Sequence, residues 1–407
     1  MSALMAEVEA PAAPLIGDRR RSLAEHRMTY PAPAAGAGLI GLLAQAGLQG
    51  RGGAGFPTSR KLAAVAEGPG PRVVVANGTE GEPASSKDSL LMRRSPHLVL
   101  DGALLAAAAV GADRVIVCID REERGALDTM RHAVGERSHE LRRGPQVEVA
   151  GTPPRYVAGE ETALVHWLNG GPAKPTLAPP RPFERGVDGR PTLVQNVETL
   201  AHIAQIAHFG TVWFSSRGAE GEPGTRLHTV SGAVARPDVV EAETGTPVWR
   251  LIELAGGATG PLSALLVGGY FGVWAEAGQV LEAPCSRAGL APLGAAPGAG
   301  IMVALPEGEC GIAYTARLMR WYAEQSARQC GPCEFGLAAI AHATESIARG
   351  TASPVLLHRL GRWAGDVEGR GACRHPDGGV RLLRSALRVF APDLDRHLTG
   401  RPCAGAR

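Results

Sequence analysis

Strand-like and helix-like apolar segments alternate between residues 73 and 150, and this alternation constrains the fold more than any other feature. Val73–Ala76 is a short apolar run with β-branched residues, which is typical of a buried strand. A helix over roughly His97–Val110 and a strand over Arg114–Asp120 follow, and a charged helix then leads to another strand near Val147. The pattern predicts an α/β fold with a parallel sheet, whose ligands bind outside the carboxyl ends of the strands.

Four short motifs rich in glycine and polar residues accompany this alternation. The first, Gly50-Arg-Gly-Gly-Ala-Gly-Phe-Pro-Thr58, has four glycines in six positions. Backbone amides of such a loop can approach a phosphate or a flavin edge closely because no Cβ intervenes, although a glycine-rich turn can also be purely structural. The second, Asn77-Gly-Thr-Glu-Gly-Glu-Pro83, follows the strand at Val73–Ala76. The other two, Tyr156-Val-Ala-Gly-Glu-Glu-Thr-Ala163 and Gln195-Asn-Val-Glu-Thr-Leu200, each open a helix.

The polar side chains of these motifs suit a ligand that carries a phosphate and a hydroxylated chain. Carboxylates can accept hydrogen bonds from ribityl or ribose hydroxyls, and exposed amides at the start of a helix can hold a phosphate. A purely structural alternative is a favourable interaction of the carboxylates with a helix dipole. The residues concerned are Glu80, Glu82, Glu160, Glu161, Asn196 and Thr199.

Lysine is a rare residue in this chain. It occurs only at Lys61, Lys87 and Lys174, although lysine and arginine together number 42. A rare residue type that lies inside or beside a motif indicates a chemical need for it. Lys61 could supply a positive charge to a phosphate or to a reduced flavin, and the alternative is a solvated surface lysine.

The composition excludes several classes of protein. With 42 basic and 40 acidic residues the formal net charge is +2, which gives no electrostatic reason to expect a nucleic-acid partner. The most apolar stretch, Leu98–Ile119, is interrupted by Asp101, Asp113 and Arg114 and is too broken to span a bilayer. The first thirty residues lack the apolar core of a secretory signal. We therefore expect a soluble, cytoplasmic protein without a membrane span.

The 407 residues are enough for two or three domains. We expect an extended N-terminal segment at 1–36 and an α/β domain at 37–215, followed by a polar, glycine-rich linker over Ser215–Gly224. Short β-like runs separated by Gly/Pro turns around one helix predict a small α+β domain at 226–300. The apolar spacing then becomes helical, which predicts a domain of four helices at 305–407.

Three of the seven cysteines form a pattern that indicates metal chemistry. Cys330-Gly-Pro-Cys333 is followed about forty residues later by Cys373. Thiolates are the usual ligands of iron–sulfur clusters, and a Cys-x-x-Cys pair lets one loop bind two irons of the same cluster. The alternatives are leftover thiols of a lost site and a redox disulfide between Cys330 and Cys333.

Taken together, the four motifs and the cysteines resemble the FMN- and NADH-binding flavoprotein subunit of respiratory complex I. The related subunits of soluble hydrogenases and formate dehydrogenases share the pattern, and the resemblance covers roughly residues 37–380 in uninterrupted order. It implies a Rossmann-like FMN domain, a small ubiquitin-like α+β (SLBB) domain near 226–275, and a C-terminal four-helix bundle that carries the iron–sulfur site.

The resemblance also assigns roles to individual residues. Phe56 and Glu82 would face the nicotinamide, with Glu82 as the catalytic group. The residues that would line FMN are Gly50, Arg51, Gly52, Lys61, Asn77, Glu80, Gly159, Glu160, Glu161, Asn196 and Thr199.

Four positions depart from the family pattern around the cofactor and the dinucleotide. Thr79 stands in place of an aspartate, and Ala64 in place of an aromatic residue that helps to stack the dinucleotide. Ala178 and Arg181 replace a lysine and a phenylalanine. We therefore expect FMN to bind and NADH to bind weakly, while Arg181 could favour the 2′-phosphate of NADPH.

One cluster ligand of the family is also missing. Its first cysteine is Ala327 here, and the three that remain are Cys330, Cys333 and Cys373. We expect a 4Fe–4S cluster with Cys403, near the end of the chain, as its fourth ligand. His375 is another candidate for that position, and the alternative for Cys403 is a solvated tail cysteine.

The resemblance implies an FMN-dependent oxidoreductase subunit. FMN would accept a hydride from NADH or NADPH and pass single electrons to the iron–sulfur cluster. The cluster would then reduce a partner protein such as a ferredoxin or a membrane reductase. The alternative is a non-catalytic electron-relay or docking subunit that keeps FMN but binds no pyridine nucleotide.

Overall fold

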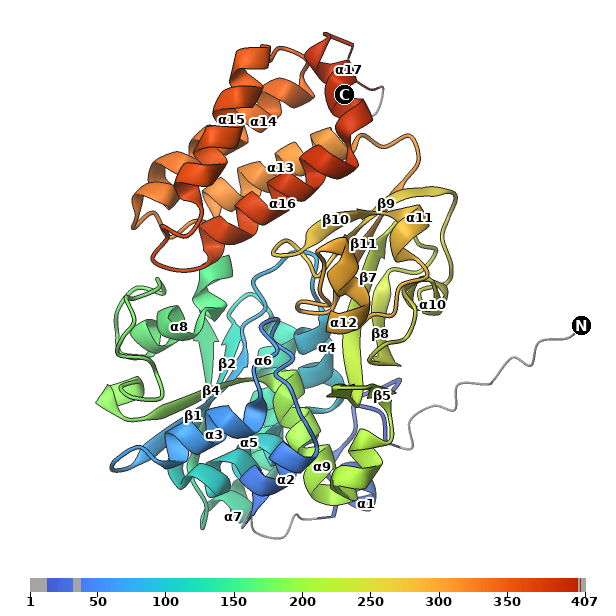
Figure 1. Ribbon diagram of the computed structural model, residues 1–407. Helices are drawn as coiled ribbons and strands as arrows, with labels where there is room; N and C mark the ends of the chain where they lie inside the picture. The colour runs from blue at the N-terminus through green and yellow to red at the C-terminus, as the bar shows by residue number, and fades with distance from the viewer. Residues whose placement is uncertain (1–12, 32–37, 402, 404–407) are drawn as a thin grey trace, which may run out of the picture.

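The computed structural model describes residues 13–31, 38–401 and 403. Figure 1 shows an α/β domain at the bottom of the view, a smaller β-rich domain beside its upper edge, and a helical bundle at the top. Within the described residues, none of the helices combines the length and the apolar character that crossing a bilayer requires.

A four-stranded parallel sheet organises the first domain. Its strands are β1 (Arg72–Gly78), β2 (Ala112–Asp120), β3 (Gln146–Thr152) and β4 (Thr192–Asn196), arranged in the order β3-β2-β1-β4. The chain proceeds outward from β1 to β3 and then returns to place β4 on the other side of β1. This reversal is a topological switch point, and in open α/β sheets it is where ligands bind.

Helices cover both faces of this sheet. One face carries α2 (Leu39–Gln45), α3 (Thr58–Ala66), α5 (Pro96–Val110), α6 (Arg124–Glu136) and α9 (Val197–Ser215), whose apolar residues form the largest core cluster. The short helices α4 and α7 span Lys87–Arg94 and Ser138–Leu141. The opposite face is covered by α8 (Glu161–Leu168), and the 3₁₀ turns η1 and η2 span Tyr156–Gly159 and Val187–Gly189.

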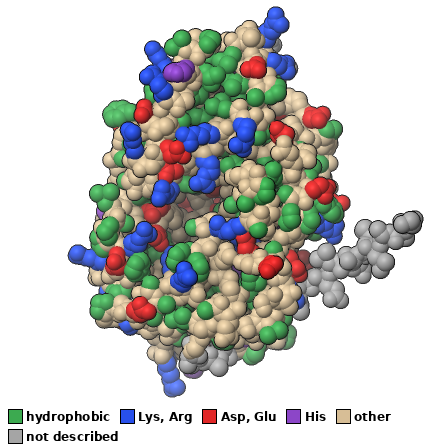
Figure 2. Space-filling view, in the orientation of Figure 1, with side chains coloured by type: hydrophobic (Ala, Val, Ile, Leu, Met, Phe, Trp, Pro, Cys, Tyr) green, Lys and Arg blue, Asp and Glu red, His purple; other side chains and the backbone are tan. Residues whose placement is uncertain are grey.

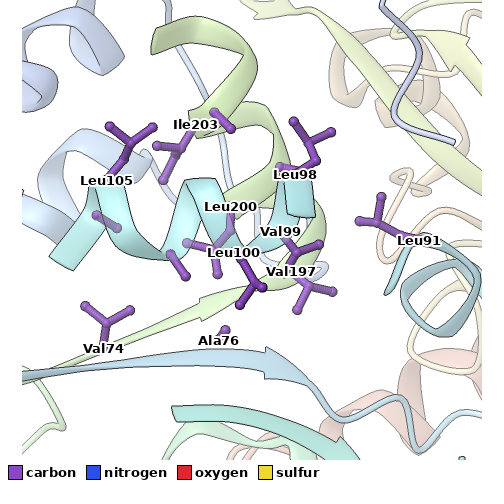
Figure 3. Packing of buried hydrophobic residues seen from close by; sticks show 14 of the residues in the cluster. Val74, Ala76, Leu91, Leu98, Val99, Leu100, Leu105, Val197, Leu200 and Ile203 are labelled. Carbon is purple, nitrogen blue, oxygen red and sulfur yellow. The ribbon is translucent and has the colours of Figure 1, made fainter. Parts of the chain in front are cut away.

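The contact between α5 and α9 is unusually close. Figure 3 shows Val74 and Ala76 of β1 below α5, with Leu200 and neighbouring residues of α9 packed against it. A Cβ at Gly102 would lie 1.8 Å from the carbonyl oxygen of Leu200, so only glycine allows this approach. Each fully buried leucine of this core contributes roughly 1.5–3 kcal/mol. The core therefore fixes the N-terminus of α9 against β1.

The segment before residue 37 is not extended throughout, which corrects the sequence prediction. Helix α1 (Leu23–Thr29) begins at a capping box in which Ser22 accepts from the backbone of Glu25 and Glu25 accepts from Ser22. The Ser-x-x-Glu spacing is a recognised start signal for a helix. His26 of this helix is buried against Asp101 of α5, with 2.7 Å between Nε2 and Oδ2.

The second domain contains a five-stranded mixed sheet. Its strands, in the order β10-β9-β11-β7-β8, are β7 (Thr225–Gly232), β8 (Asp238–Glu243), β9 (Leu262–Val267), β10 (Val273–Glu276) and β11 (Ile301–Pro306). The predicted helix is α10 (Val248–Leu254), and α11 (Ala277–Val280), α12 (Arg287–Leu290) and η3 (Ala291–Leu293) are shorter additions. The predicted linker holds a small hairpin, β5 (Gly218–Ala219) with β6 (Glu222–Pro223).

The C-terminal domain is helical. It comprises α13 (Gly311–Glu324), η4 (Pro332–Leu337), α14 (Ala338–Ala348), α15 (Pro354–Val367), α16 (His375–Val389) and the short α17 (Ala391–Leu398). The segment η4 is a π-helix, a form that occurs frequently at functional sites. In Figure 1, α16 runs from the α/β domain to the far end of the bundle, where α17 lies.

Candidate functional site

A cavity of about 740 Å³ opens at the carboxyl ends of β1 and β4. Figure 2 shows a hollow near the centre of one face of the molecule, with lysine, arginine and acidic side chains around it. All three domains contribute to the cavity wall. The predicted site residues that line it are Gly50, Gly52, Phe56, Lys61, Asn77, Glu80, Glu82, Gly159, Glu160, Glu161, Asn196 and Thr199.

The glycine loop between α2 and α3 lies against the N-terminus of α9. The backbone N–H of Arg51 donates to Thr199 Oγ1 at 2.8 Å. A Cβ at Gly52 would lie 3.2 Å from the Cβ of Asn196, so the loop approaches α9 as closely as a residue without a side chain allows. Gly53 adopts φ +108°, a conformation that favours glycine. Thr199 therefore positions this loop.

The Arg51 side chain does not line the cavity, which corrects the sequence prediction. It is fully buried, and its Nη2 donates to the Pro223 carbonyl at 2.9 Å. Nε and Nη1 have no hydrogen-bond partner among the described residues. Burial, together with the nearby Arg226, lowers the pKa of Arg51 to about 9. Arg51 thus connects the glycine loop to the linker hairpin, on the side away from the cavity.

Asn77, at the end of β1, connects two of the motifs. Its Nδ2 donates to the Gly159 carbonyl at 2.9 Å, and its Oδ1 accepts from the backbone of Thr79 at 3.1 Å. A Cβ at Gly159 would lie 2.9 Å from the Thr79 carbonyl oxygen. Glu160 caps α8 by accepting from the backbone amides of its first turn. These bonds make one wall of the cavity rigid.

A buried charge network forms the opposite wall, and sequence reasoning identified only part of it. Lys87 Nζ donates to Asp88 Oδ1 at 2.7 Å and to Glu198 Oε2 at 2.8 Å. Asn196 Nδ2 donates to Asp88 Oδ2 at 2.7 Å, and the other oxygen of Glu198 accepts from the backbone of Leu227 in β7. The rarity of lysine was the signal for Lys87, whereas no motif marked Asp88.

Ionisation in this network is set by competition between burial and pairing. Burial alone would raise the pKa of Glu198, but Lys87 and other cationic neighbours lower it to about 2. Burial would lower the pKa of Lys87, but Asp88 and Glu198 raise it above its usual value. The Lys87–Glu198 pair is therefore ionised, and it connects the α/β domain to β7.

Two carboxyl groups after β1 have raised pKa values. Glu80 accepts from the backbone amides of Asp88 and Ser89 at 3.2 and 3.0 Å, so it lies at the N-terminus of α4. Burial, and then Asp88, raise the pKa of Glu80 to about 7. Glu82 Oε1 accepts from the backbone of Tyr270 at 2.7 Å, and burial raises its pKa to about 8. Both groups can exchange protons near neutral pH.

The rim of the cavity presents an aromatic ring and an ion pair. Phe56 is 54% exposed although it is a large hydrophobic residue, which suits a stacking surface for a planar ring. Lys61 Nζ lies 3.0 Å from Glu161 Oε2, and both side chains are about a third exposed. The pair can open toward a charged ligand at little cost, because a partly exposed ion pair contributes only about 0–1 kcal/mol.

Residues from the second and third domains complete the cavity, and sequence reasoning missed them. Arg287 Nη2 donates to the Ala54 carbonyl at 2.6 Å and so holds the glycine loop from the side of α12. Phe271, Arg374 and Arg381 line the cavity as well. No signal in the sequence relates these residues to the motifs, because more than 200 positions separate Arg287 from the glycine loop.

The three family-matched cysteines lie together at the end of the bundle that faces the cavity. Burial, and then Cys330, raise the pKa of the Cys333 thiol to about 12, with a smaller effect from Cys373. Burial also raises the pKa of the Cys373 thiol. Cys373 itself lines the cavity, and Cys333 belongs to the π-helix η4. A set of soft donors therefore adjoins the cavity.

Cys403 lies elsewhere, which corrects the prediction that it completes this set. Its Sγ is 3.1 Å from Nε2 of His397, and Cys310 Sγ is 3.2 Å from the same nitrogen. Cys310 caps the N-terminus of α13, whereas Cys330 follows the C-terminus of that helix. The 14 residues of α13 extend about 21 Å. Cys403 thus lies at the opposite end of the bundle.

The departures from the family pattern fall partly outside the cavity wall. Thr79 lines the cavity and hydrogen-bonds Thr152 through their hydroxyls, at 3.2 Å. Ala64 lies on α3, and neither it nor Ala178 nor Arg181 is among the residues that line the cavity. The Arg181 side chain is exposed, and its backbone N–H donates to Glu184 at 2.7 Å.

Three family models match successive parts of the chain. They are the Nuo51 FMN-binding domain at residues 43–205, the SLBB domain at 228–269 and the NADH-ubiquinone oxidoreductase-F iron-sulfur binding region at 313–397. The predicted α/β domain, ubiquitin-like domain and C-terminal helical iron–sulfur domain are thereby confirmed. The fold and the site define a flavin and iron–sulfur oxidoreductase subunit.

Individual relatives specify the family. The second NADH-quinone oxidoreductase F subunit of Rhizobium meliloti is 31% identical over 379 residues, which are 90% of each chain. The F subunit of the Streptomyces coelicolor enzyme is 30% identical over 383 residues, 90% of this chain and 84% of its own. An air-oxidized NAD⁺-reducing [NiFe]-hydrogenase chain matches with a TM-score of 0.85 and 31% identity over 93% of this chain and 65% of its own. The protein belongs to the family of NADH-quinone oxidoreductase F subunits.

The residues present fit the cofactors of this family. Cβ atoms at Gly52 and Gly159 would press on Asn196 and Thr79, so backbone rather than side chains forms these parts of the cavity. Such a surface suits close contact with a planar flavin and its phosphate. Three thiols next to the cavity supply the donor type that an iron–sulfur cluster needs.

Proposed function

We propose that the chain oxidises NADH at the large cavity and transfers electrons to an iron–sulfur cluster bound by Cys330, Cys333 and Cys373. The observation that carries the proposal is the position of Cys373, which lines the same cavity as Phe56 and Glu82. Donor, flavin and cluster would thus share one enclosed space. Bound FMN supplies two-electron acceptance and one-electron release.

The residues of the cavity have separable tasks in this proposal. The amides of the glycine loop and of the α9 N-terminus hold the phosphate, since the positive end of the helix dipole favours an anion there. Glu80 and Glu161 would hold flavin hydroxyls, and Lys61 would supply a positive charge to the bound flavin. Phe56 stacks on the nicotinamide, while Glu82 orients it through a carboxyl group whose pKa of about 8 keeps it largely protonated at neutral pH. A neutral Glu82 does not repel an electron-rich reduced flavin.

The donor is NADH rather than NADPH. The relatives and the solved hydrogenase carry NADH or NAD⁺ in their names. Arg181, the candidate partner for a 2′-phosphate, is exposed and is not among the cavity-lining residues. The weak NADH affinity expected from the altered positions stays a prediction.

The fourth ligand of the cluster is His375 in this proposal, since Cys403 lies at the other end of the bundle. Nε2 of His375 lies 2.9 Å from the Tyr322 carbonyl, so this nitrogen carries the proton and Nδ1 is left with a lone pair. Nδ1 is buried and has no hydrogen-bond partner among the described residues. A buried, unpaired imidazole nitrogen two residues after Cys373 is a suitable donor.

The electron acceptor is a partner protein, as expected for a subunit of a multi-subunit oxidoreductase. A cytoplasmic location of this chain and an acceptor such as a ferredoxin or a membrane reductase fit the proposed chemistry. The competing function is a relay or docking subunit that keeps FMN but binds no dinucleotide, and the altered residues Ala64, Ala178 and Arg181 favour it.

Anaerobic mixing of the purified flavoprotein with NADH or NADPH separates these functions. We expect NADH to bleach the absorbance band of the bound flavin, and Glu82→Gln to slow this bleaching while FMN stays bound. The matched control is Glu309→Gln, which changes a carboxylate that is about a third exposed and pairs with Arg317 of the helical domain. A flavin that neither dinucleotide bleaches would favour the docking function, and faster bleaching by NADPH would overturn the assignment of the donor.

A further inference from the structure

Three soft side chains from distant parts of the sequence converge at the end of the bundle remote from the cavity. Cys310 Sγ and Cys403 Sγ lie 3.2 and 3.1 Å from Nε2 of His397, and all three ligand atoms lie within 4.8 Å of one another. The three residues are 1%, 8% and 0% exposed in the order Cys310, Cys403, His397. Neither the flavin nor the iron–sulfur chemistry uses this cluster.

The imidazole of His397 is oriented for a ligand. Its Nδ1 lies 3.1 Å from the carbonyl oxygen of Ile347 and therefore donates to it. This bond fixes the tautomer in which Nε2 carries a lone pair. Both sulfurs lie close to that nitrogen, which also accepts from the backbone N–H of Cys403 at 3.4 Å. Histidines that bind metals almost always donate their other ring nitrogen to a carbonyl or a carboxylate in this way.

The dimensions of the cluster match a single ion rather than an iron–sulfur cluster. Two thiolates on one Zn²⁺ at about 2.3 Å lie about 3.8 Å apart in tetrahedral geometry and cannot exceed about 4.6 Å. All three ligand atoms here lie within 4.8 Å of one another, and binding requires the nitrogen–sulfur distances of 3.1 and 3.2 Å to open only slightly. Within the described residues, no other group of histidine, cysteine or acidic side chains is so compact.

A fourth donor lies one helical turn before His397. Asp393 precedes His397 by four positions on α17, so the two side chains share one face of the helix. The Asp393 carboxylate lies near the Cys403 thiol. Zinc would replace this thiol proton, since metal ligands bind in the deprotonated form.

We propose that Cys310, His397 and Cys403 form a structural Zn²⁺ site, with the Asp393 carboxylate or a water as the fourth ligand. Two thiolates and one imidazole are a donor set that zinc prefers. The ion would fasten α17 and the chain after it to the N-terminus of α13, where β11 of the SLBB domain leads into the bundle. The site is thus separate from the electron-transfer site and stabilises the far end of the bundle.

Metal analysis of the purified protein tests this proposal. The full chain is produced with iron and zinc in the medium, dialysed against a weak chelator, and assayed for both metals and for FMN. We expect about one zinc per chain in the wild type and none in Cys403→Ser, with iron and FMN unchanged. Cys403→His, which supplies another zinc ligand, should restore zinc.

Two matched variants distinguish this site from the other cysteines. Cys285→Ser changes a buried cysteine of the SLBB domain and should keep both metals. Cys330→Ser should lose iron and keep zinc. The proposal is overturned by zinc that persists in Cys403→Ser, by zinc that disappears in Cys330→Ser alone, or by wild-type protein without zinc.

Measurements on the unmodified chain cover the case in which a variant does not fold. Alkylation of Cys403 should be slow in the wild type and become fast after a strong chelator removes zinc. Peptide mapping that finds a disulfide between Cys310 and Cys403, or alkylation that a chelator does not accelerate, would overturn the site as well.

Discussion

Lys87→Met removes the only cationic partner that hydrogen-bonds the buried carboxylates of Glu198 and Asp88 within the described residues. The side chains of Lys87 and Glu198 are 2% and 0% exposed, so the remaining charges cannot be solvated. Breaking a buried pair by removing one partner costs about 3–5 kcal/mol. With a urea m-value of about 2.5 kcal/mol per molar, the unfolding midpoint of the flavin-free protein should fall by about 1.2–2 M.

Lys61→Met is the matched control for this experiment. Lys61 also pairs with a glutamate, with 3.0 Å between its Nζ and Glu161 Oε2. The two side chains, however, are 29% and 32% exposed. A pair of this kind contributes about 0–1 kcal/mol. Urea unfolding followed by tryptophan fluorescence should therefore show a much smaller shift for Lys61→Met. Equal shifts in the two variants would refute the claim that burial decides the energy of these pairs.

Three further variants test the site. Ala327→Cys places a thiol beside Cys333 and should slow cluster loss in air, because a thiolate can then take the place of the His375 imidazole; an unchanged rate of loss would show that position 327 does not reach the cluster. The folded pKa of Glu82, about 8, exceeds the ordinary 4.5, so its contribution to stability is full at low pH and is lost as pH rises through 8. In thermal unfolding of flavin-free protein, Glu82→Gln should match the wild type near pH 4, below the ordinary pKa of 4.5, and be more stable near pH 9. The gain is about 1.4 kcal/mol for each tenfold difference between the acid dissociation constants of Glu82 in the folded and unfolded chain; parallel pH profiles would contradict this. Gly52→Leu should abolish FMN retention because even a Cβ there lies 3.2 Å from Asn196, and a yellow variant would show that the loop can yield.

Local sequence was sufficient to predict the site wherever a motif lies at the end of a strand. Asn77 and Asn196 end adjacent parallel strands and are register partners, so their motifs meet as the alternation predicts. The sequence motifs did not predict the direction in which each side chain of a loop points. Adjacent residues of the glycine loop face opposite sides, so Gly52 lines the cavity while the Arg51 side chain enters the core.

Distance along the chain did not predict which cysteines of the helical domain lie close together. The thirty residues between Cys373 and Cys403 are long enough to return to the cluster, but α16 and α17 carry the chain away from it instead. Contacts such as Arg287 with the glycine loop depend on how the second domain is placed against the first. No local pattern encodes that placement, because it results from packing and from the buried network around Glu198.

The cavity walls come from three successive parts of the chain, from Gly50 in the first to Arg381 in the last. A nascent chain on the ribosome therefore has no complete flavin pocket until the start of α16 has emerged. Flavin loading is consequently a late step of maturation, and tight FMN binding reports that all three parts have docked correctly. Once bound, the flavin stabilises that docking by about 1.4 kcal/mol for each tenfold excess of its concentration over Kd. A shortage of the flavin would therefore weaken the docking of the three parts.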